Sequence, residues 1–153
     1  MRLSFFRKYK GPISHVDITW EQLVENLSKH DVGTNKFENP AFSPAFYDID
    51  EFQRLNENVR GFSLWVGDFD KFDEDGVFAL INRVEELGWS MVLYSTWSHE
   101  IEPYCVRPVF PLSRVALPEE WPVLWRVINK MLGGQTDKSC KDLSRLYFVG
   151  LLL

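Results

Sequence analysis

Cysteine is scarce in this 153-residue chain, and its two cysteines, Cys105 and Cys140, lie far apart in the sequence. Because no Cys-x-x-Cys pair is present, the sequence argues against a structural zinc site. Two separated cysteines also give no basis for a disulfide framework. We therefore expect a protein of a reducing compartment, and the cytoplasm is the predicted location.

Long apolar runs and an excess of positive charge are also missing. The sequence contains no stretch near the roughly 20 apolar residues of a membrane-spanning helix, so no membrane association is expected. The formal net charge is -5, whereas proteins that track a nucleic-acid backbone over a large surface are usually basic. A small basic pocket for a triphosphate stays compatible with this charge, because net charge does not set the local field.

Apolar and aromatic residues, in contrast, are abundant. The hydrophobic fraction is 45% and includes six Trp and twelve Phe, which argues against a disordered chain and allows a sizeable core. A chain of this length is expected to form one domain, residues 1–153. Within it we predict an N-terminal α/β extension over residues 1–60 and a core over residues 61–153.

The hydrophobic periodicity of the core predicts the order strand, helix, strand, strand, helix, strand. The expected strands cover residues 62–70, 90–97, 104–112 and 145–152, and the expected helices cover residues 76–87 and 118–132, with Pro118 as the first helical residue. This order is typical of an α+β fold, the RNA-recognition-motif-like or ferredoxin-like βαββαβ sheet with helices on one face. In the extension, Thr19 and Gln22 form a capping-box pattern that predicts a helix over residues 19–30.

Two carboxylates end the first predicted core strand, at Asp68 and Asp70. Side chains two positions apart on a strand point to the same face, and two such carboxylates repel each other unless a cation lies between them. A divalent metal ion is the usual solution, which makes metal-dependent phosphoryl transfer the leading hypothesis. The alternative is that both residues belong to a turn and cap before the next helix.

Other polar residues follow or interrupt the remaining strands. His99, after Ser98, is either a ligand contact or a residue of a hairpin turn. Arg107 lies inside an apolar run and therefore needs an anionic partner. This partner is either a carboxylate of the first core strand or the phosphate of a ligand, for which the guanidinium fork is well shaped.

A third acid precedes the last strand, and two residues compete for this role. Asp142 comes three residues before Arg145, and Asp137 lies in the preceding turn. In a ferredoxin-like sheet the last strand runs antiparallel to the first, which predicts that Asp142 approaches Asp68 and Asp70. The choice between the two acids stays open.

Taken together, these motifs resemble the archaeo-eukaryotic primase superfamily, most of all the primase-polymerase domains of phage and plasmid replication proteins. The resemblance covers residues 40–150. It is carried by Phe42-Ser-Pro-Ala-Phe46, Asn58-Val59, Asp68-Phe-Asp70, Tyr94-Ser-Thr-Trp-Ser-His99, Val106-Arg-Pro-Val-Phe-Pro-Leu-Ser-Arg114 and Asp142-Leu-Ser-Arg-Leu-Tyr147.

The resemblance implies a metal-dependent nucleotidyltransferase, a DNA primase or polymerase that uses nucleoside triphosphates through a two-metal mechanism. It implies two Mg²⁺ or Mn²⁺ ions as cofactors, and nucleoside triphosphates, a single-stranded DNA template and a replicative helicase as partners. The implied metal ligands are Asp68, Asp70 and a third acid, best matched by Asp142. The implied catalytic residues are Asp68, Asp70, His99 and Asp142, and the implied nucleotide-binding residues are Ser98, His99, Arg107 and Arg145.

Other functions fit the same expected fold. One is a non-catalytic module that binds nucleic acid or protein, and another is an accessory protein that has lost its activity. A third is a metal-dependent replication-initiation nuclease, which typically needs a histidine cluster and a nucleophilic tyrosine. Trp65 and Trp97 are candidates for stacking on bases, with burial in the core as the alternative.

Overall fold

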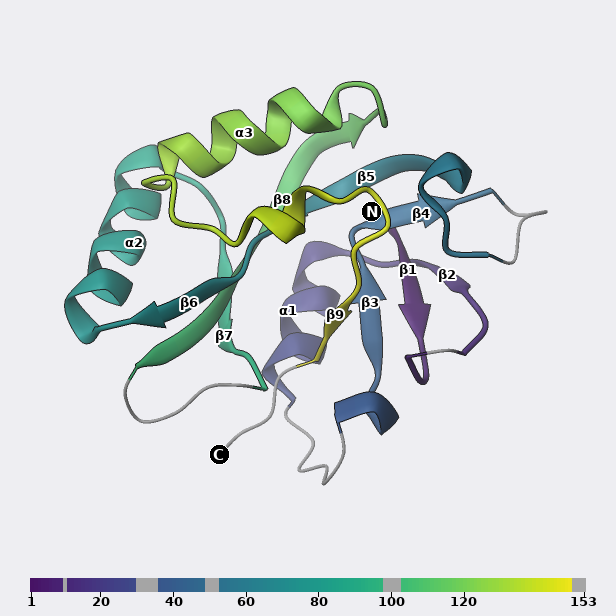
Figure 1. The fold of residues 1–153 in the computed structure, drawn as a ribbon, viewed down its shortest axis with the longest axis horizontal. Helices are drawn as coiled ribbons and strands as arrows, with labels where there is room; N and C mark the ends of the chain where they lie inside the picture. The colour runs from purple at the N-terminus through teal and green to yellow at the C-terminus, as the bar shows by residue number, and fades with distance from the viewer. Residues whose placement is uncertain (10, 30–35, 49–52, 98–102, 150–153) are drawn as a thin grey trace.

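The computed structural model describes residues 1–9, 11–29, 36–48, 53–97 and 103–149, to which every structural statement below refers (Figure 1). Over these ranges the chain forms two antiparallel sheets and three α-helices, an α+β architecture consistent with the predicted ferredoxin-like core. No helix in these ranges is long and apolar enough to cross a membrane.

The first sheet combines strands from both ends of the chain. Its order is β2-β1-β3-β9, and all neighbouring strands are antiparallel. The bounds are β1 Arg2–Phe6, β2 Ser14–Asp17, β3 Ala41–Ser43 and β9 Tyr147–Phe148. The predicted N-terminal extension is therefore joined to the C-terminal segment by backbone hydrogen bonds.

The second sheet is built around the long strand β8. Its order is β4-β5-β8-β6, and β7 also pairs with β8. The bounds are β4 Ala45–Tyr47, β5 Val59–Val66, β6 Phe69–Phe72, β7 Val92–Ser95 and β8 Tyr104–Ala116. Since β5 and β6 pair with successive parts of β8, they occupy one edge of it, and β7 occupies the other. The predicted strand 62–70 is thus present but interrupted between Val66 and Phe69.

The helices follow the sequence signals closely. Helix α1, Trp20–Ser28, begins with the predicted capping box of Thr19 and Gln22. Helix α2, Glu74–Leu87, ends at Gly88, whose positive φ of 66° suits glycine. Helix α3, Trp121–Met131, starts three residues later than predicted: Pro122, rather than Pro118, lies in its first turn, where its missing N–H needs no partner.

The last strand lies elsewhere than the sequence analysis expected. We predicted that residues 145–152 would run antiparallel to the first core strand, but β9 pairs with β3 of the first sheet. The reason is edge occupancy: Phe62 of β5 pairs with Ala45 of β4 on one side and with Ala116 of β8 on the other. Both edges of β5 are thus taken at Phe62, and the last strand pairs instead with the apolar strand β3.

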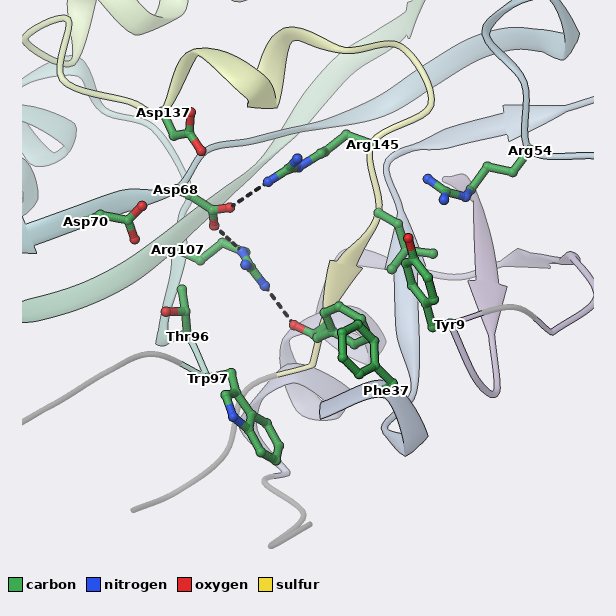
Figure 2. A pocket seen from close by; sticks show the side chains of 12 residues that line it. Tyr9, Phe37, Arg54, Asp68, Asp70, Thr96, Trp97, Arg107, Asp137 and Arg145 are labelled. Atoms are coloured by element: carbon green, nitrogen blue, oxygen red, sulfur yellow. Dashed lines mark hydrogen bonds and ion pairs between the residues drawn. The ribbon is translucent and has the colours of Figure 1, made fainter. Parts of the chain in front are cut away.

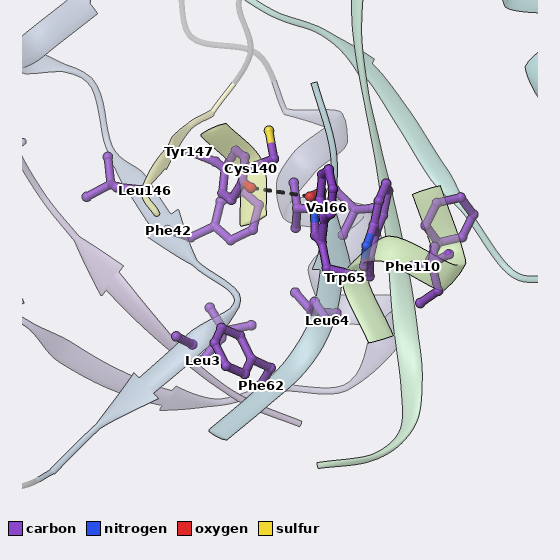
Figure 3. Close-up of a cluster of buried hydrophobic side chains, with 14 of the residues drawn as sticks. Leu3, Phe42, Phe62, Leu64, Trp65, Val66, Phe110, Cys140, Leu146 and Tyr147 are labelled. Atoms are coloured by element: carbon purple, nitrogen blue, oxygen red, sulfur yellow. Dashed lines mark hydrogen bonds between the residues drawn. The ribbon is translucent and has the colours of Figure 1, made fainter. Parts of the chain in front are cut away.

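A single apolar core joins the sheets and α3 (Figure 3). The ring of Phe62 stacks on that of Trp121 with 3.9 Å between centroids, which fixes α3 against β5. Trp65 is fully buried beside Phe110 and Trp125, so it is a core residue and not a base-stacking one. The hydroxyl of Tyr147 donates to the carbonyl of Val66 at 3.2 Å and so ties β9 to the end of β5.

Candidate active site between the two sheets

A pocket of about 370 Å³ takes its walls from both sheets (Figure 2). Acidic side chains lie at one end, aromatic side chains lie at the other, and two arginines lie between them. The pocket has the size of a small-molecule site.

Three carboxylates line the acidic end: Asp68, Asp70 and Asp137. Asp68 lies in the interruption between β5 and β6, and Asp70 is an exposed residue of β6. Asp137 caps the 3₁₀ helix η3, Lys138–Lys141, and its backbone N–H donates to the carbonyl of Asp68 at 2.8 Å. This bond holds the third acid next to the first.

Gly67 permits this close approach of the two segments. A Cβ atom at position 67 would lie 2.5 Å from the ring of Trp65 and 2.7 Å from Cγ2 of Thr136. Atoms of a side chain cannot come that close without displacing their neighbours. The absence of a side chain at position 67 therefore lets residues 136 and 137 pack against the end of β5.

Asp68 is held by two arginines. Its Oδ1 accepts a hydrogen bond from Nε of Arg107 at 2.5 Å, and its Oδ2 lies 3.9 Å from Nη2 of Arg145. Asp68 and Arg107 are both buried. Burial opposes the charge of Arg107, but the contacts with Tyr94 and Asp68 outweigh it and hold the pKa of Arg107 above its usual value. The salt bridge to the first core strand, one of two interpretations of Arg107 from the sequence, is confirmed.

Arg107 is also fixed by contacts on its other side. Its Nη1 donates to the carbonyl of Phe148 at 2.7 Å and to the hydroxyl of Tyr94 at 3.2 Å. Its guanidinium carbon lies 4.9 Å from the ring centroid of Tyr147, within cation–π distance. Arg107 thereby connects Asp68 in the second sheet to β9 in the first.

Arg145 and Arg54 present positive charge to the same pocket. The Nε of Arg145 is buried and has no hydrogen-bond partner in the described part of the chain, although its side chain is 36% exposed. Arg54 donates to the carbonyl of Ser144 at 2.6 Å and lies over the ring of Tyr9. The sequence did not identify Arg54 as a site residue, because Arg54 belongs to an irregular segment without a strand or helix pattern.

The third acid of the pocket is Asp137 rather than Asp142. Asp142 follows η3, where its N–H bonds to the carbonyl of Ser139, and it is not among the residues that line the pocket. Its expected approach to Asp68 depended on the last strand pairing with β5, which does not occur. Hydrogen bonds from the backbone N–H and the hydroxyl of Ser139, together with the charge of Arg145, lower the pKa of Asp137.

The predicted site residues therefore divide into three groups. Asp68, Asp70, Arg107 and Arg145 lie together in the pocket. Asp142 does not line it, and Ser98 and His99 lie outside the described residues. Thr96 and Trp97, which directly precede Ser98 in the chain, are part of the pocket wall.

The donor set has the right chemistry for a divalent cation. Carboxylate oxygens are the preferred ligands of Mg²⁺ and Mn²⁺, and Oδ2 of Asp68 has only the distant contact with Arg145. Across the residues that the structure describes, however, no three His, Cys, Asp or Glu side chains are gathered closely enough to hold a metal ion together. The three carboxylates thus share a pocket without converging on one point.

The aromatic end of the pocket was not predicted. Tyr9 follows β1, Phe37 belongs to the 3₁₀ helix η1, Lys36–Glu38, and Phe148 belongs to β9. Their ring centroids lie 5.4 to 6.0 Å apart, so the three form one cluster. Since these residues come from three separated segments, no local sequence pattern relates them.

Comparisons with known proteins give two similar structures. No protein-family model and no curated protein matches the chain. The archaeo-eukaryotic primase domain of the primase-polymerase from cyanophage S-2L is 11% identical with a TM-score of 0.53, and the match covers 97% of this chain and 71% of that one. The polymerase domain of Ligase D from Mycobacterium tuberculosis, in complex with DNA, is 11% identical with a TM-score of 0.50, and the match covers 97% and 67%.

Both similar structures have the archaeo-eukaryotic primase type of fold, and this chain shares it along nearly its whole length. The resemblance that the strand-end motifs indicated is confirmed at the level of the fold.

Proposed function

We propose that this chain is a nucleotidyltransferase of the primase-polymerase type that binds a nucleoside triphosphate in the pocket between its sheets. The observation that carries the proposal is the gathering of three aspartates and three arginines in one pocket. The fold shared with a primase-polymerase and with a DNA-bound polymerase domain supports it. Because the walls come from both sheets, we propose that residues 1–153 act as one domain.

Arginine side chains are proposed to bind the triphosphate. A guanidinium offers a planar fork of donors that suits phosphate oxygens. The side chain of Arg145 lines the pocket, is 36% exposed, and makes only a 3.9 Å ion-pair contact with Asp68 among the described residues. Arg107, by contrast, already donates hydrogen bonds from Nε to Asp68 and from Nη1 to Phe148 and Tyr94. We therefore assign Arg145 to the phosphates, and assign Arg107 mainly to the positioning of Asp68.

Asp68, Asp70 and Asp137 are proposed to hold two Mg²⁺ or Mn²⁺ ions together with phosphate oxygens of the nucleotide, because the described carboxylates do not converge closely enough to hold an ion by themselves. Asp142 is the alternative third acid. When bound, such ions neutralise the phosphates and activate the attacking hydroxyl. Arg107 fixes Asp68 through Oδ1, which leaves Oδ2 with only the 3.9 Å contact with Arg145. The bond between Asp137 and the Asp68 backbone keeps the third carboxylate nearby. Positioning and charge, rather than proton transfer by side chains, are what this chemistry needs from the protein.

Further contacts and partners are proposed from the sequence motifs. Ser98 and His99 are assigned to the triphosphate, since they follow pocket-lining Trp97 in the chain. A single-stranded DNA template, a replicative helicase, a place in phage or plasmid replication and a cytoplasmic location complete the proposal.

Incorporation of a labelled nucleotide tests the proposal. The purified chain is incubated with Mn²⁺ or Mg²⁺, a primed or unprimed DNA template and a labelled nucleoside triphosphate. We expect incorporation by the natural chain and by Asp75→Asn, an exposed acid outside the pocket, and none by Asp70→Asn. Equal incorporation by Asp70→Asn and the natural chain would remove Asp70 from the active site.

A non-catalytic nucleotide-binding module is the second candidate. It is favoured by the ion pair between Asp68 and Arg107, which commits one oxygen of a proposed metal ligand to the protein. Nucleotide binding without incorporation, at every metal and template tested, would support this candidate over the enzyme.

A further inference from the structure

The aromatic cluster of Tyr9, Phe37 and Phe148 is the part of the pocket that the proposed chemistry does not use. The rings of Tyr9 and Phe148 are stacked at 5.9 Å, and Phe37 stands edge-on to both. Phe37 is 58% exposed, which is high for so large an apolar side chain. An exposed ring supported by two others leaves apolar surface facing the pocket.

This cluster stands at a fixed position relative to the charged end. The carbonyl of Phe148 accepts the 2.7 Å hydrogen bond from Arg107, whose Nε binds Asp68. One arginine therefore spans the distance from the carboxylates to the backbone of the aromatic cluster. Figure 2 shows Asp68, Asp70 and Asp137 on one side, Tyr9 and Phe37 on the other, and Arg107 and Arg145 between.

Arg54 adds positive charge at the aromatic end. Its guanidinium carbon lies 5.9 Å from the ring centroid of Tyr9, and the bond to the Ser144 carbonyl holds it there. Planar cations and aromatic rings are the surfaces on which nucleobases stack. The pocket thus has a charged end and a flat aromatic end, the same two parts that a nucleotide has.

We infer that Tyr9, Phe37 and Phe148 form the subsite for the nucleobase of the bound nucleoside triphosphate, with Phe37 as the exposed stacking face. The inference rests on the proposed function and extends it, because it assigns the first sheet a role in substrate binding. The second sheet and the segment from η3 to Arg145 hold the triphosphate, and the first sheet with the segments next to its strands holds the base.

Equilibrium binding of two probes separates this subsite from the phosphate site. The probes are a non-hydrolysable nucleoside triphosphate and inorganic tripolyphosphate, each titrated into the full chain with Mn²⁺. Phe37→Ala is expected to weaken nucleotide binding about 10-fold and to leave tripolyphosphate binding unchanged. Phe37→Trp is expected to restore the nucleotide affinity. Phe78→Ala is the matched control, because Phe78 is 55% exposed on α2 and does not line the pocket.

Three outcomes in the Phe37→Ala variant would overturn the inference. One is an unchanged nucleotide affinity in Phe37→Ala, and another is an equal loss for both probes, which would indicate a general disturbance of the pocket. The third is a loss of affinity only for a single-stranded oligonucleotide, titrated as a third probe, which would assign the cluster to the template strand. If the natural chain binds tripolyphosphate and nucleotide equally, the base subsite fails while the phosphate site stands; if it binds neither, the proposed function fails as well.

Discussion

Asp68 determines how the charged end of the pocket is arranged. It is buried, accepts a hydrogen bond from Arg107 through Oδ1, and turns Oδ2 toward Arg145 at 3.9 Å. A carboxylate fixed through one oxygen has a defined orientation, which is how residues behind a metal site commonly act on its ligands. Asp70 is exposed, so its replacement should affect the stability of the fold less than replacement of Asp68, even though both belong to the same proposed site.

Replacement of Asp68 and replacement of Asp70 are expected to have different effects on the free energy of unfolding. Asp68→Ala leaves Arg107 buried without its carboxylate and is expected to lower the free energy of unfolding by about 3–5 kcal/mol. Asp70→Ala, at an exposed site, is expected to change it by less than about 0.5 kcal/mol. Denaturant unfolding of both variants measures the difference. Equal small losses would mean that the charge of Arg107 does not depend on Asp68.

Arg145 is expected to be important for triphosphate binding. Arg145→Gln removes a cation whose Nε lacks a partner in the described ranges, so little folding energy should be lost. A charge-assisted hydrogen bond is worth about 1.5–3 kcal/mol, so the affinity for a non-hydrolysable nucleoside triphosphate should fall at least about 10-fold. Calorimetric titration measures it, with Arg114→Gln as the control, because Arg114 pairs with Glu120 away from the pocket. The assignment is wrong if both variants bind equally well.

At the scale of elements, the interruption between β5 and β6 places the acidic residues. The strand stops at Gly67 and Asp68, and the segment before η3 packs into the space that Gly67 leaves. The interruption between β5 and β6 therefore positions Asp68 directly, and it positions Asp137 through the packing of the segment before η3.

Gly67→Ala is expected to disturb this arrangement. Its Cβ would lie 2.5 Å from the buried ring of Trp65 and 2.7 Å from Thr136, so neighbours must move. Overpacking of a core typically costs about 1–3 kcal/mol, and here it also pushes the segment that bears Asp137. The midpoint temperature of thermal unfolding and the affinity for nucleotide should both decline. An unchanged affinity would show that the position of Asp137 is not set by Gly67.

A histidine links the two sheets and makes the link sensitive to pH. Nε2 of His15 in β2 accepts the backbone N–H of Tyr47 in β4 at 3.1 Å, which requires an unprotonated nitrogen. Burial, helped by the charge of Arg2, lowers the pKa of His15 in the folded protein. The unfolded chain therefore takes up the proton first, and stability declines as the pH falls below about 6.5, the ordinary histidine value.

His15→Gln is expected to remove this part of the pH dependence, because a glutamine oxygen can accept the same N–H without titrating. Unfolding free energies at pH 7 and pH 5 should differ less for this variant than for the natural chain. An equal loss of unfolding free energy between pH 7 and pH 5 in the variant and in the natural chain would assign the pH dependence to other groups.

On the scale of the whole molecule, the pocket exists because the two sheets are assembled together. The first sheet contains β1 to β3 from the N-terminal part and β9 from the C-terminal part, so neither half of the sequence forms the pocket alone. Hydrogen bonds between the sheets, such as that from the N–H of Arg2 to the hydroxyl of Ser63, maintain this assembly.

The sequence predicted what depends on near neighbours along the chain. The capping box at Thr19 and the extent of α2 follow from local patterns, and both are present. Asp68 follows the end of β5, whereas Asp70 lies inside β6 and not at a strand end. The pairing of β9 could not be predicted in this way. It joins residues more than 100 positions apart, and no local pattern specifies such a pairing.

The site was predicted in part for the same reason. Arg107 was recognisable because an arginine in an apolar strand needs an anion, and its partner is indeed a carboxylate of the first core strand. Asp137 and Asp142 lie five positions apart in one turn-rich segment, and only the folded structure separates the one in the pocket from the one outside it. The aromatic cluster of Tyr9, Phe37 and Phe148 left no motif, because its members come from separate segments.

A crystal structure of the chain with Mn²⁺ and a non-hydrolysable nucleoside triphosphate tests the central claim most directly, that the pocket between the sheets is a nucleotidyl-transfer site. The account predicts metal at Asp68, Asp70 and Asp137, phosphates at Arg145, and the base against Phe37. Metal held by Asp142 would correct the third acid and leave the site in place. An empty pocket at millimolar ligand, or a nucleotide bound elsewhere, would contradict the claim.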